Sequence, residues 1–253
     1  MIMISKLDLN CDLGEFYGMY DEKRDSAIMP YITSCNIACG FHSGDPVAIS
    51  RTIRLAQKNG VAIGAHPSYP DLQGFGRRVM NLTKEELEAC ILYQISALKG
   101  MTEALGTELH HVKPHGALYN FASRDEETAI GVVKAVVQVK NDMILYAPEG
   151  SVLKEVAEDA GLIVKREVFA DRSYEDDLSL RSRKMDGAVL TKSDSVLKQL
   201  EGFIEEKVTT FDGLELSISA DTLCLHSDTE GATELAKDIH DFLTEHGIEI
   251  TAD

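Results

Sequence analysis

Short apolar segments alternate with longer amphipathic segments along the whole chain. The short segments have the length and aliphatic character of strands, and most of them stop at a group of polar or ionisable residues. They cover residues 2–9, 34–38, 61–65, 109–112, 143–146, 162–169 and 222–225. A regular alternation of strands and helices predicts a parallel sheet with helices packed outside it.

The longer segments carry the start and stop signals of helices. Asp45 precedes a helix predicted at 46–59, and Gly60 follows that helix as a natural stop. The patterns Thr-x-x-Glu at 83–86 and Ser-x-x-Glu at 123–126 have the form of capping boxes, so they predict that helices begin there. Further helices are predicted at 151–159, 191–206 and 230–245.

The number of strand-like segments indicates the architecture. Seven of them in 253 residues favour a closed or nearly closed (β/α) barrel, whose usual length is about 250 residues. No Gly-x-Gly-x-x-Gly follows any of them, which removes the main reason to expect an open dinucleotide-binding sheet. No linker or change of composition divides the chain, so residues 1–253 are predicted to form a single barrel domain.

Charge and cysteine content narrow the partners and the compartment. The 25 Lys and Arg against 42 Asp and Glu give a formal net charge of −17. So acidic a surface repels nucleic-acid phosphates and anionic lipids, which argues against nucleic-acid and membrane partners. The five cysteines do not form a disulfide framework, and the sequence has neither a signal peptide nor an apolar run of about 20 residues. We therefore expect a cytoplasmic protein.

Polar side chains collect where the strand-like segments end. In a parallel barrel all of these ends open on one face, and that face carries the active site. Six groups that converge on one mouth predict a site built for chemistry. The residues are Asn10, Asp12, Glu15, Asn36, His42, Asp45, His66, Lys113, His115, Asp171, Arg172, His226 and Asp228.

Two of these residues share a direction. Lys113 and His115 lie two positions apart on an extended segment, so both side chains point to the same side. The histidines and carboxylates of the mouth could also bind a divalent metal. Because the imidazoles come from different strands, their spacing does not decide whether a metal is present.

Arginine pairs offer a local positive charge in this acidic chain. Arg77 and Arg78 follow a glycine-rich loop, and a second pair stands at 181 and 183. A guanidinium group suits a carboxylate or a phosphate, and surface ion pairing is an equal alternative for each pair. The sequence contains no P-loop pattern and no nucleophile elbow.

Six motifs resemble one known family, the LamB/YcsF family, and they follow its order along essentially the whole chain. That family forms the A subunit of bacterial 5-oxoprolinase. The motifs are DLNCDLGE (8–15), NIACGFHSGDP (36–46), GAHPSYPDLQGFGRR (64–78), VKPHGALYN (112–120), EVFADRSY (167–174) and CLHSD (224–228). The sequence departs from the family pattern at Ser43, at Ser227, where glycine is usual, and in the loop after Tyr174.

The resemblance implies both a fold and a reaction. The fold is an irregular (β/α)7 TIM-like barrel of the glycoside hydrolase/deacetylase type. The reaction is the ATP-dependent opening of 5-oxoproline to glutamate, with Mg²⁺ expected as the counter-ion of ATP. It further implies that separate 5-oxoprolinase subunits B and C are partners.

The family's polar motif positions fall on the strand-end residues already described and on the first arginine pair. We expect a catalytic group and a group that binds the substrate. Asp12, His66 and His115 are the unranked candidates for the general base, whereas Lys113, Arg77 and Arg172 are the candidates for holding phosphate. The catalytic group is Asp12, His66, Lys113 and His115. The substrate-binding group is Glu15, His42, Asp45, Arg77, Arg78, Asp171, Arg172, His226 and Asp228.

Two other functions remain compatible with the same residues. A stand-alone metal-dependent deacetylase or carbohydrate hydrolase would use the barrel and its His and Asp mouth without ATP. A non-catalytic subunit would only present 5-oxoproline to its partners. Dependence of turnover on ATP and on the partner subunits separates the three functions.

Overall fold

The computed structural model describes residues 4–18 and 22–253, and seven parallel strands form a closed barrel at its centre. Each strand pairs with the next along the chain, and the last one pairs with both β6 and β1, which closes the ring. The (β/α)7 barrel predicted from the sequence is therefore confirmed. The strands are β1 (Lys6–Leu13), β2 (Ser34–Ala38), β3 (Ala62–His66), β4 (His111–Val112), β5 (Ile144–Pro148), β6 (Ile163–Phe169) and β9 (Thr222–His226).

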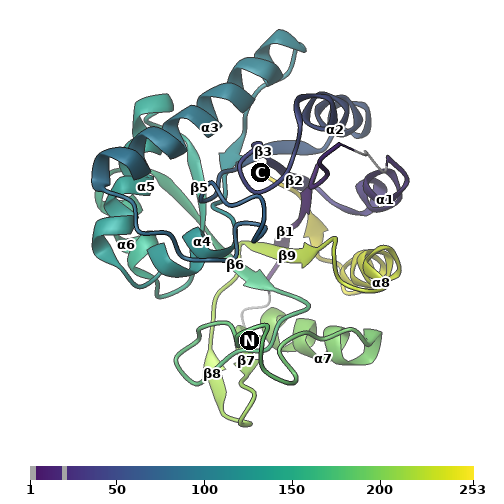
Figure 1. Cartoon of the computed structure of the whole chain (residues 1–253). Helices are drawn as coiled ribbons and strands as arrows, with labels where there is room; N and C mark the ends of the chain where they lie inside the picture. The colour runs from purple at the N-terminus through teal and green to yellow at the C-terminus, as the bar shows by residue number, and fades with distance from the viewer. Residues whose placement is uncertain (1–3, 19–21) are drawn as a thin grey trace.

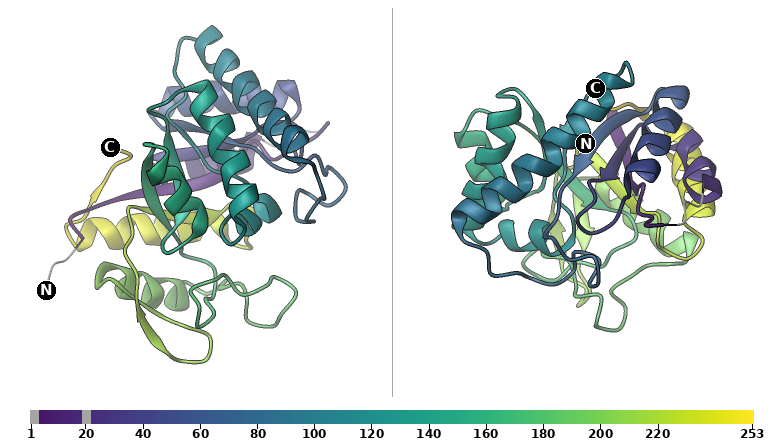
Figure 2. Two further views of the ribbon diagram at one scale, coloured as in Figure 1. Left: turned by 90° about the vertical axis from the view of Figure 1, so that its left-hand side faces the viewer. Right: turned by 45° about the horizontal axis from the view of Figure 1, so that its top comes forward.

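Helices surround the strands (Figure 1). They are α1 (Glu22–Ile28), α2 (Pro46–Asn59), α3 (Lys84–Ala104), α4 (Gly116–Ala122), α5 (Glu126–Val139), α6 (Val152–Asp159), α7 (Ser193–Ile204) and α8 (Ala232–Glu245), with a 3-10 turn at Met29–Tyr31. The hairpin β7 (Lys207–Thr209) and β8 (Glu215–Ser217) lies with α7 on one side of the barrel, as Figures 1 and 2 both show. The last strand, β10 (Glu249–Ile250), pairs with the beginning of β1.

The strands turn their aliphatic residues outward and their polar residues inward. In β1, Leu7 and Leu9 belong to the apolar core between the strands and the helices. Asp8 between them points into the barrel, where its carboxylate accepts hydrogen bonds from Ser34, Tyr146 and Thr222. Because side chains alternate along a strand, one strand serves an apolar layer and a polar one. The barrel therefore has a polar interior inside an aliphatic shell.

Several predicted helix ends are confirmed. Asp45 caps α2, and Gly60 ends it with a φ of 69°. Thr83 and Glu86 form the predicted capping box of α3. The capping box predicted at 123–126 is wrong, because Asp125 caps α5 by accepting from the Thr128 N–H.

The predicted first strand is also corrected, because β1 begins at Lys6 and runs to Leu13 rather than ending at residue 9. Residues 2 and 3 of that prediction lie outside the described residues. Asn10 and Asp12 look like the start of a polar loop in the sequence, yet they belong to the strand because they face a polar interior. Helices α1 and α4, the β7–β8 hairpin and β10 were not predicted from the sequence.

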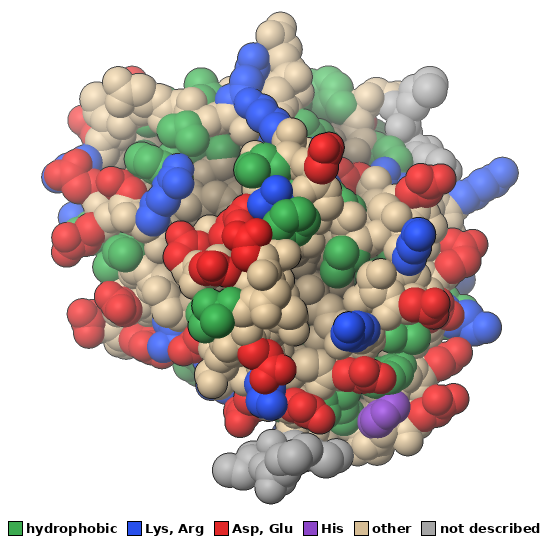
Figure 3. Space-filling model, turned by 90° about the horizontal axis from the view of Figure 1, so that it is seen from below, with side chains coloured by type: hydrophobic (Ala, Val, Ile, Leu, Met, Phe, Trp, Pro, Cys, Tyr) green, Lys and Arg blue, Asp and Glu red, His purple; other side chains and the backbone are tan. Residues whose placement is uncertain are grey.

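Acidic side chains are spread among Lys and Arg over the face shown in Figure 3, in keeping with the net charge of −17. Within the described residues, no helix combines the length and the apolar character needed to cross a bilayer.

Candidate functional site

The carboxyl ends of β1 and β3, with the loops that follow β2 and β4, bring four side chains together. We call Glu15, His42, His66 and His115 the histidine cluster. One ligand-type atom from each of them lies within 4.8 Å of the others. All four side chains are at most 5% exposed. These residues were expected at the mouth from the sequence, and the structure places them there together.

Hydrogen bonds to the backbone set the orientation of two of these rings. His66 Nδ1 lies 2.7 Å from the carbonyl oxygen of Lys113, and His115 Nε2 lies 2.9 Å from that of Phe75. A carbonyl oxygen only accepts, so each of these nitrogens carries the hydrogen. The remaining nitrogens, His66 Nε2 and His115 Nδ1, face each other at 2.9 Å.

Burial and nearby charges shift the pKa values of two histidines of the cluster and of the neighbouring Asp12. Burial lowers the pKa of both His42 and His115 well below the ordinary value, so these imidazoles are neutral. Burial alone would raise the pKa of Asp12. Its neighbours His66 and Lys113 outweigh that effect and hold the pKa well below the ordinary value. Asp12 is therefore a buried carboxylate at the edge of the histidine cluster, with its Oδ2 3.3 Å from His66 Nε2.

Lys113 lies at the centre of a second group. Its Nζ is 2.9 Å from carboxylate oxygens of both Asp12 and Glu167 and 2.9 Å from the Cys224 sulfur. Lys113 is 2% exposed. Burial would lower its pKa, but Asp12 and Cys224 raise it well above the ordinary value. The ammonium of Lys113 is thus engaged by groups inside the barrel. The anion-holding role expected from the sequence stays a prediction.

A third group follows β9 and β6. His226 Nδ1 lies 2.9 Å from Asp171 Oδ1, and the Thr229 hydroxyl donates to the other carboxylate oxygen. The ring of His226 stacks on Phe169 with centroids 5.6 Å apart. Its side chain is 14% exposed, whereas that of Asp171 is fully buried. Asp171 thus orients an imidazole whose Nε2 is left for other partners.

A loop with the sequence Gly74-Phe75-Gly76-Arg77 covers the histidine cluster. Phe75 adopts a φ of 53°, and its ring meets His42 and His115 edge-on. Position 76 has no room for a side chain, because a Cβ on Gly76 would lie 2.8 Å from His115 Cδ2. Arg77 lies over the Phe75 ring and pairs with Asp228 at 2.6 Å.

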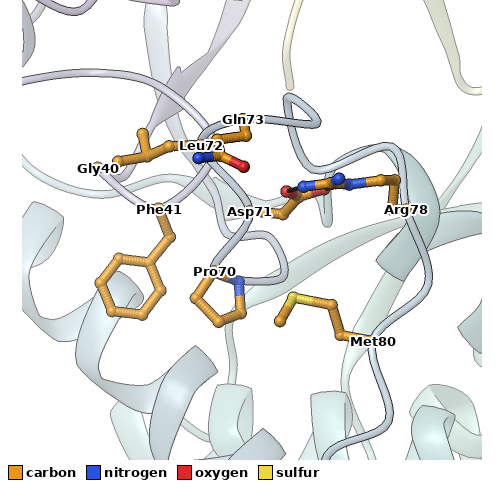
Figure 4. A pocket seen from close by; sticks show the side chains of 8 residues that line it. All are labelled: Gly40, Phe41, Pro70, Asp71, Leu72, Gln73, Arg78 and Met80. Carbon is orange, nitrogen blue, oxygen red and sulfur yellow. Dashed lines mark hydrogen bonds and ion pairs between the residues drawn. The ribbon is translucent and has the colours of Figure 1, made fainter.

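Three other residues expected at the site have structural partners. Asp45 is the cap of α2, and its second oxygen accepts from the Gly18 N–H. Arg78 pairs with Asp71 beside a surface pocket that Phe41, Pro70 and Met80 also line (Figure 4).

The third is Arg172, which is buried and donates to the carbonyl oxygens of Ala188 and Arg181. Burial with the nearby Arg183 lowers the pKa of Arg172 to about 10. Two of its donors are engaged in this way, and the phosphate-holding role expected of Arg172 stays a prediction. The second arginine pair separates, since Arg181 turns to Glu175 while Arg183 faces Asp228.

Glu167 also belongs to the group around Lys113, although the strand-end pattern did not predict it. It is 2% exposed and lies between Lys113 and the hydroxyl of Tyr119. Its position in β6, two residues before Phe169, was the available signal, because alternation places it inside the barrel.

Ser227, which departs from the family pattern, fits without a left-handed backbone. Among the described residues, positive φ outside glycine occurs only at Phe75, Leu178 and Glu206. The Ser227 hydroxyl donates to the carbonyl oxygen of Asp12 and accepts from Arg24. The serine at this position therefore adds a hydrogen bond between β1 and the segment after β9.

The comparisons with known proteins cover nearly the whole chain. The model of the LamB/YcsF family matches residues 7–252. A protein of Acinetobacter baumannii (strain ACICU), named as the A subunit of 5-oxoprolinase, is 48% identical over 245 residues, which are 96% of each chain. The protein of the same name from Clostridium beijerinckii is 45% identical and covers 97% of this chain and 96% of its own.

Solved structures agree with this relationship. The lactam utilization protein of Thermus thermophilus superposes with a TM-score of 0.91 at 44% identity, over 98% of this chain and 100% of its own. The Xyl-CE4 domain of a xylanase from a termite hindgut metagenome has a TM-score of 0.51 at 10% identity, over 98% of this chain and 87% of its own, and shares the fold alone. The chain belongs to the LamB/YcsF family.

Proposed function

We propose that this chain is the A subunit of an ATP-driven 5-oxoprolinase and opens the lactam of 5-oxoproline to glutamate together with subunits B and C. The observation that carries the proposal is the 48% identity, over 96% of both chains, to a protein named as that component of 5-oxoprolinase. The buried, polar mouth of the barrel supports it, because an unactivated amide needs a preorganised polar site.

The chemistry defines what the site must do. Transfer of the γ-phosphoryl group of ATP to the lactam oxygen gives ADP and an activated ring carbon. Water then adds to that carbon, the ring C–N bond breaks, and the nitrogen takes a proton. The resulting acyl phosphate reacts with a second water to give glutamate and phosphate. The chain must therefore supply a proton carrier and a cationic group for the substrate carboxylate.

We assign the proton transfers to His226. Its Nδ1 is held by Asp171 at 2.9 Å, and its side chain is 14% exposed. An imidazole oriented by a buried carboxylate is a common arrangement for a general base. His226 would remove a proton from the attacking water and return it to the leaving nitrogen.

We assign the substrate carboxylate to Arg183. Its Nη1 lies 3.9 Å from Asp228, and its Nη2 is buried without a hydrogen-bond partner among the described residues. A buried donor left without an acceptor is costly, so an incoming carboxylate would satisfy it. Arg77 pairs with the other carboxylate oxygen of the same Asp228.

The test is 5-oxoproline-dependent release of ADP and glutamate by the chain co-expressed with its partner subunits. His226→Asn is expected to lower kcat by about 10²–10⁴, the usual effect of losing an acid–base group, with an unchanged melting temperature. Asp171→Asn is expected to lower kcat and to shift its pH profile. The matched control His246→Asn alters an exposed histidine at the end of the last helix and leaves kcat unchanged.

Two results would contradict the proposal. One is hydrolysis of a substrate by the assembled protein without ATP, which would indicate a self-sufficient hydrolase. The other is full 5-oxoprolinase activity in the His226→Asn variant, which would remove that residue from the proton transfers.

A further inference from the structure

We propose that the histidine cluster binds one divalent transition-metal ion, such as Zn²⁺, through His66 Nε2, His115 Nδ1 and the carboxylate of Glu15. The binding itself does not depend on the reaction proposed above. A role of the ion in polarising the lactam oxygen does depend on it.

The facing nitrogens carry the first part of the argument. His66 Nε2 and His115 Nδ1 are 2.9 Å apart, and the hydrogen of each ring is already committed to a carbonyl oxygen on its other side. When each ring holds only that hydrogen, these two atoms are both lone-pair acceptors. Two buried acceptors at this distance need a cation between them, either a shared proton or a metal ion.

A third potential metal ligand favours the metal ion over the shared proton. Glu15 Oε1 lies 3.6 Å from His115 Nδ1, and the ligand atoms of the cluster are all within 4.8 Å of one another. Ligands at about 2.0–2.2 Å from a tetrahedral zinc ion are about 3.3–3.6 Å apart. The distances of 2.9 Å from His115 Nδ1 to His66 Nε2 and of 3.6 Å from His115 Nδ1 to Glu15 Oε1 are close to what one ion requires. Two imidazoles and one glutamate also leave a fourth position open, as in zinc hydrolases.

The surroundings of the rings match those of metal ligands. A histidine that binds a metal usually donates its other N–H to a carbonyl or carboxylate oxygen, which fixes the ring. Both rings do so here, to Lys113 and to Phe75. The carboxylate of Asp12 lies 3.3 Å from His66 Nε2 and adds negative charge beside the site.

His42 has a different part in the cluster. Its ring is stacked on that of His115, with centroids 3.8 Å apart and planes 3° from parallel. A metal ion lies in the plane of an imidazole ligand, so it cannot lie in both of these planes. We infer that His42 positions the Glu15 carboxylate, because its Nε2 lies 3.2 Å from Glu15 Oε1.

A second group of potential ligands carries no such proposal. Asp12, Cys224 and His226 also lie close together. The ammonium of Lys113 is 2.9 Å from both the Asp12 carboxylate and the Cys224 sulfur, so a cation already serves these two groups.

The experiment measures binding to the purified full-length chain without turnover, so its failure is separate from a failure of the proposed function. The chain is stripped with a chelator and titrated with Zn²⁺ in competition with a chromophoric chelator. Co²⁺ is added to a second sample, and its visible absorption reports the coordination number. We expect one equivalent of Zn²⁺ and the intense Co²⁺ bands of a four- or five-coordinate site.

Variants locate the ion. His66→Gln, His115→Gln and Glu15→Gln should each weaken Zn²⁺ binding by about 100-fold or more, whereas His42→Gln should weaken it by about tenfold, the effect of an outer partner. The control His246→Gln removes an exposed imidazole and should change nothing. Circular dichroism checks that each variant is folded. If a histidine variant is unfolded, the binding result for Glu15→Gln decides the question.

The proposal is overturned if the stripped wild-type chain does not take up one equivalent of Zn²⁺. It is also overturned if the ion binds equally well to the folded variants, which would indicate a surface site. In either case a shared proton, rather than a metal, holds His66 and His115 together.

Discussion

At the scale of single residues, the role of an ionisable side chain depends on what surrounds it. Lys113 has a strand-end position that suits a substrate anion, yet its ammonium lies between Asp12 and Glu167 inside the barrel. Removing one partner of a buried ion pair leaves the other charge uncompensated. This usually lowers the free energy of unfolding by more than the intact pair contributes to it.

We therefore expect Lys113→Met to lower the free energy of unfolding by about 3–5 kcal/mol, measured by urea denaturation. The matched control is Lys84→Met, because Lys84 forms an exposed ion pair with Glu127. This variant should change the free energy of unfolding by less than about 1 kcal/mol. Unchanged stability of the Lys113→Met protein, together with a large loss of activity, would restore the anion-holding role instead.

Asp25 is a single residue that makes the stability of the folded chain depend on pH. Burial raises its pKa from 3.8 to about 6, even though its carboxylate accepts hydrogen bonds from the Gly14 N–H and the Thr52 hydroxyl. Arg24 beside it opposes the shift, and Glu15 adds to it. Between about pH 4 and 6 the folded chain therefore binds more protons at Asp25 than the unfolded chain does.

It follows that ionisation of Asp25 lowers the stability of the folded chain as the pH rises through this interval. Asp25→Asn removes this loss. The free energy of unfolding of the variant, relative to that of the wild type, should therefore rise by about 2–3 kcal/mol from about pH 4 to about pH 7.5. Urea denaturation of both proteins at the two pH values measures the difference. A constant difference would show that Asp25 titrates at its ordinary pKa.

At the scale of elements, short sequence patterns set helix ends only where the side chain reaches the backbone. Asp125 and Ser123 both precede α5, but it is Asp125 that accepts from the Thr128 N–H. Ser123 ends α4 instead, and its hydroxyl donates to the Tyr119 carbonyl oxygen.

Asp125→Ala should therefore lower the free energy of unfolding by about 1 kcal/mol, the usual value for losing an N-cap. Ser123→Ala should change it by less than about 0.5 kcal/mol, since no helix start depends on that hydroxyl. Thermal denaturation of the two variants compares them directly. The reverse order would mean that the capping box predicted at 123–126 was correct.

At the scale of the whole molecule, the closed barrel concentrates polar groups from its strands and their loops at one mouth, and this mouth is covered. The loop through Phe75 lies over the histidine cluster, and Arg77 joins it to Asp228 across the mouth. No P-loop occurs in the sequence, and the relatives of this chain are named as one component of an enzyme.

We accordingly expect the isolated chain to release no ADP and no glutamate from ATP and 5-oxoproline, and the assembly with subunits B and C to release both. A coupled assay for ADP, run with and without the co-expressed partners, checks this. Sustained turnover by the purified single chain would mean that it needs no partner.

The barrel, and the gathering of polar side chains at the ends of its strands, could be predicted from chain order and periodicity. Alternating strands and helices predicted the parallel architecture, and the strand ends identified Asp12, His66, Lys113 and His226 as residues of the mouth. These inferences succeed because periodicity and chain order are local properties, and because the ends of parallel strands must share one face.

The pairing of these residues emerges only from the folded chain. Which atom faces which depends on strand register, on ring rotation and on loops that come from distant parts of the sequence. Glu167 was not recognised because its partners, Lys113 and Tyr119, are remote from it along the chain. For the same reason, the sequence could suggest a metal but could not show that two imidazole lone pairs converge on one point with a carboxylate beside them.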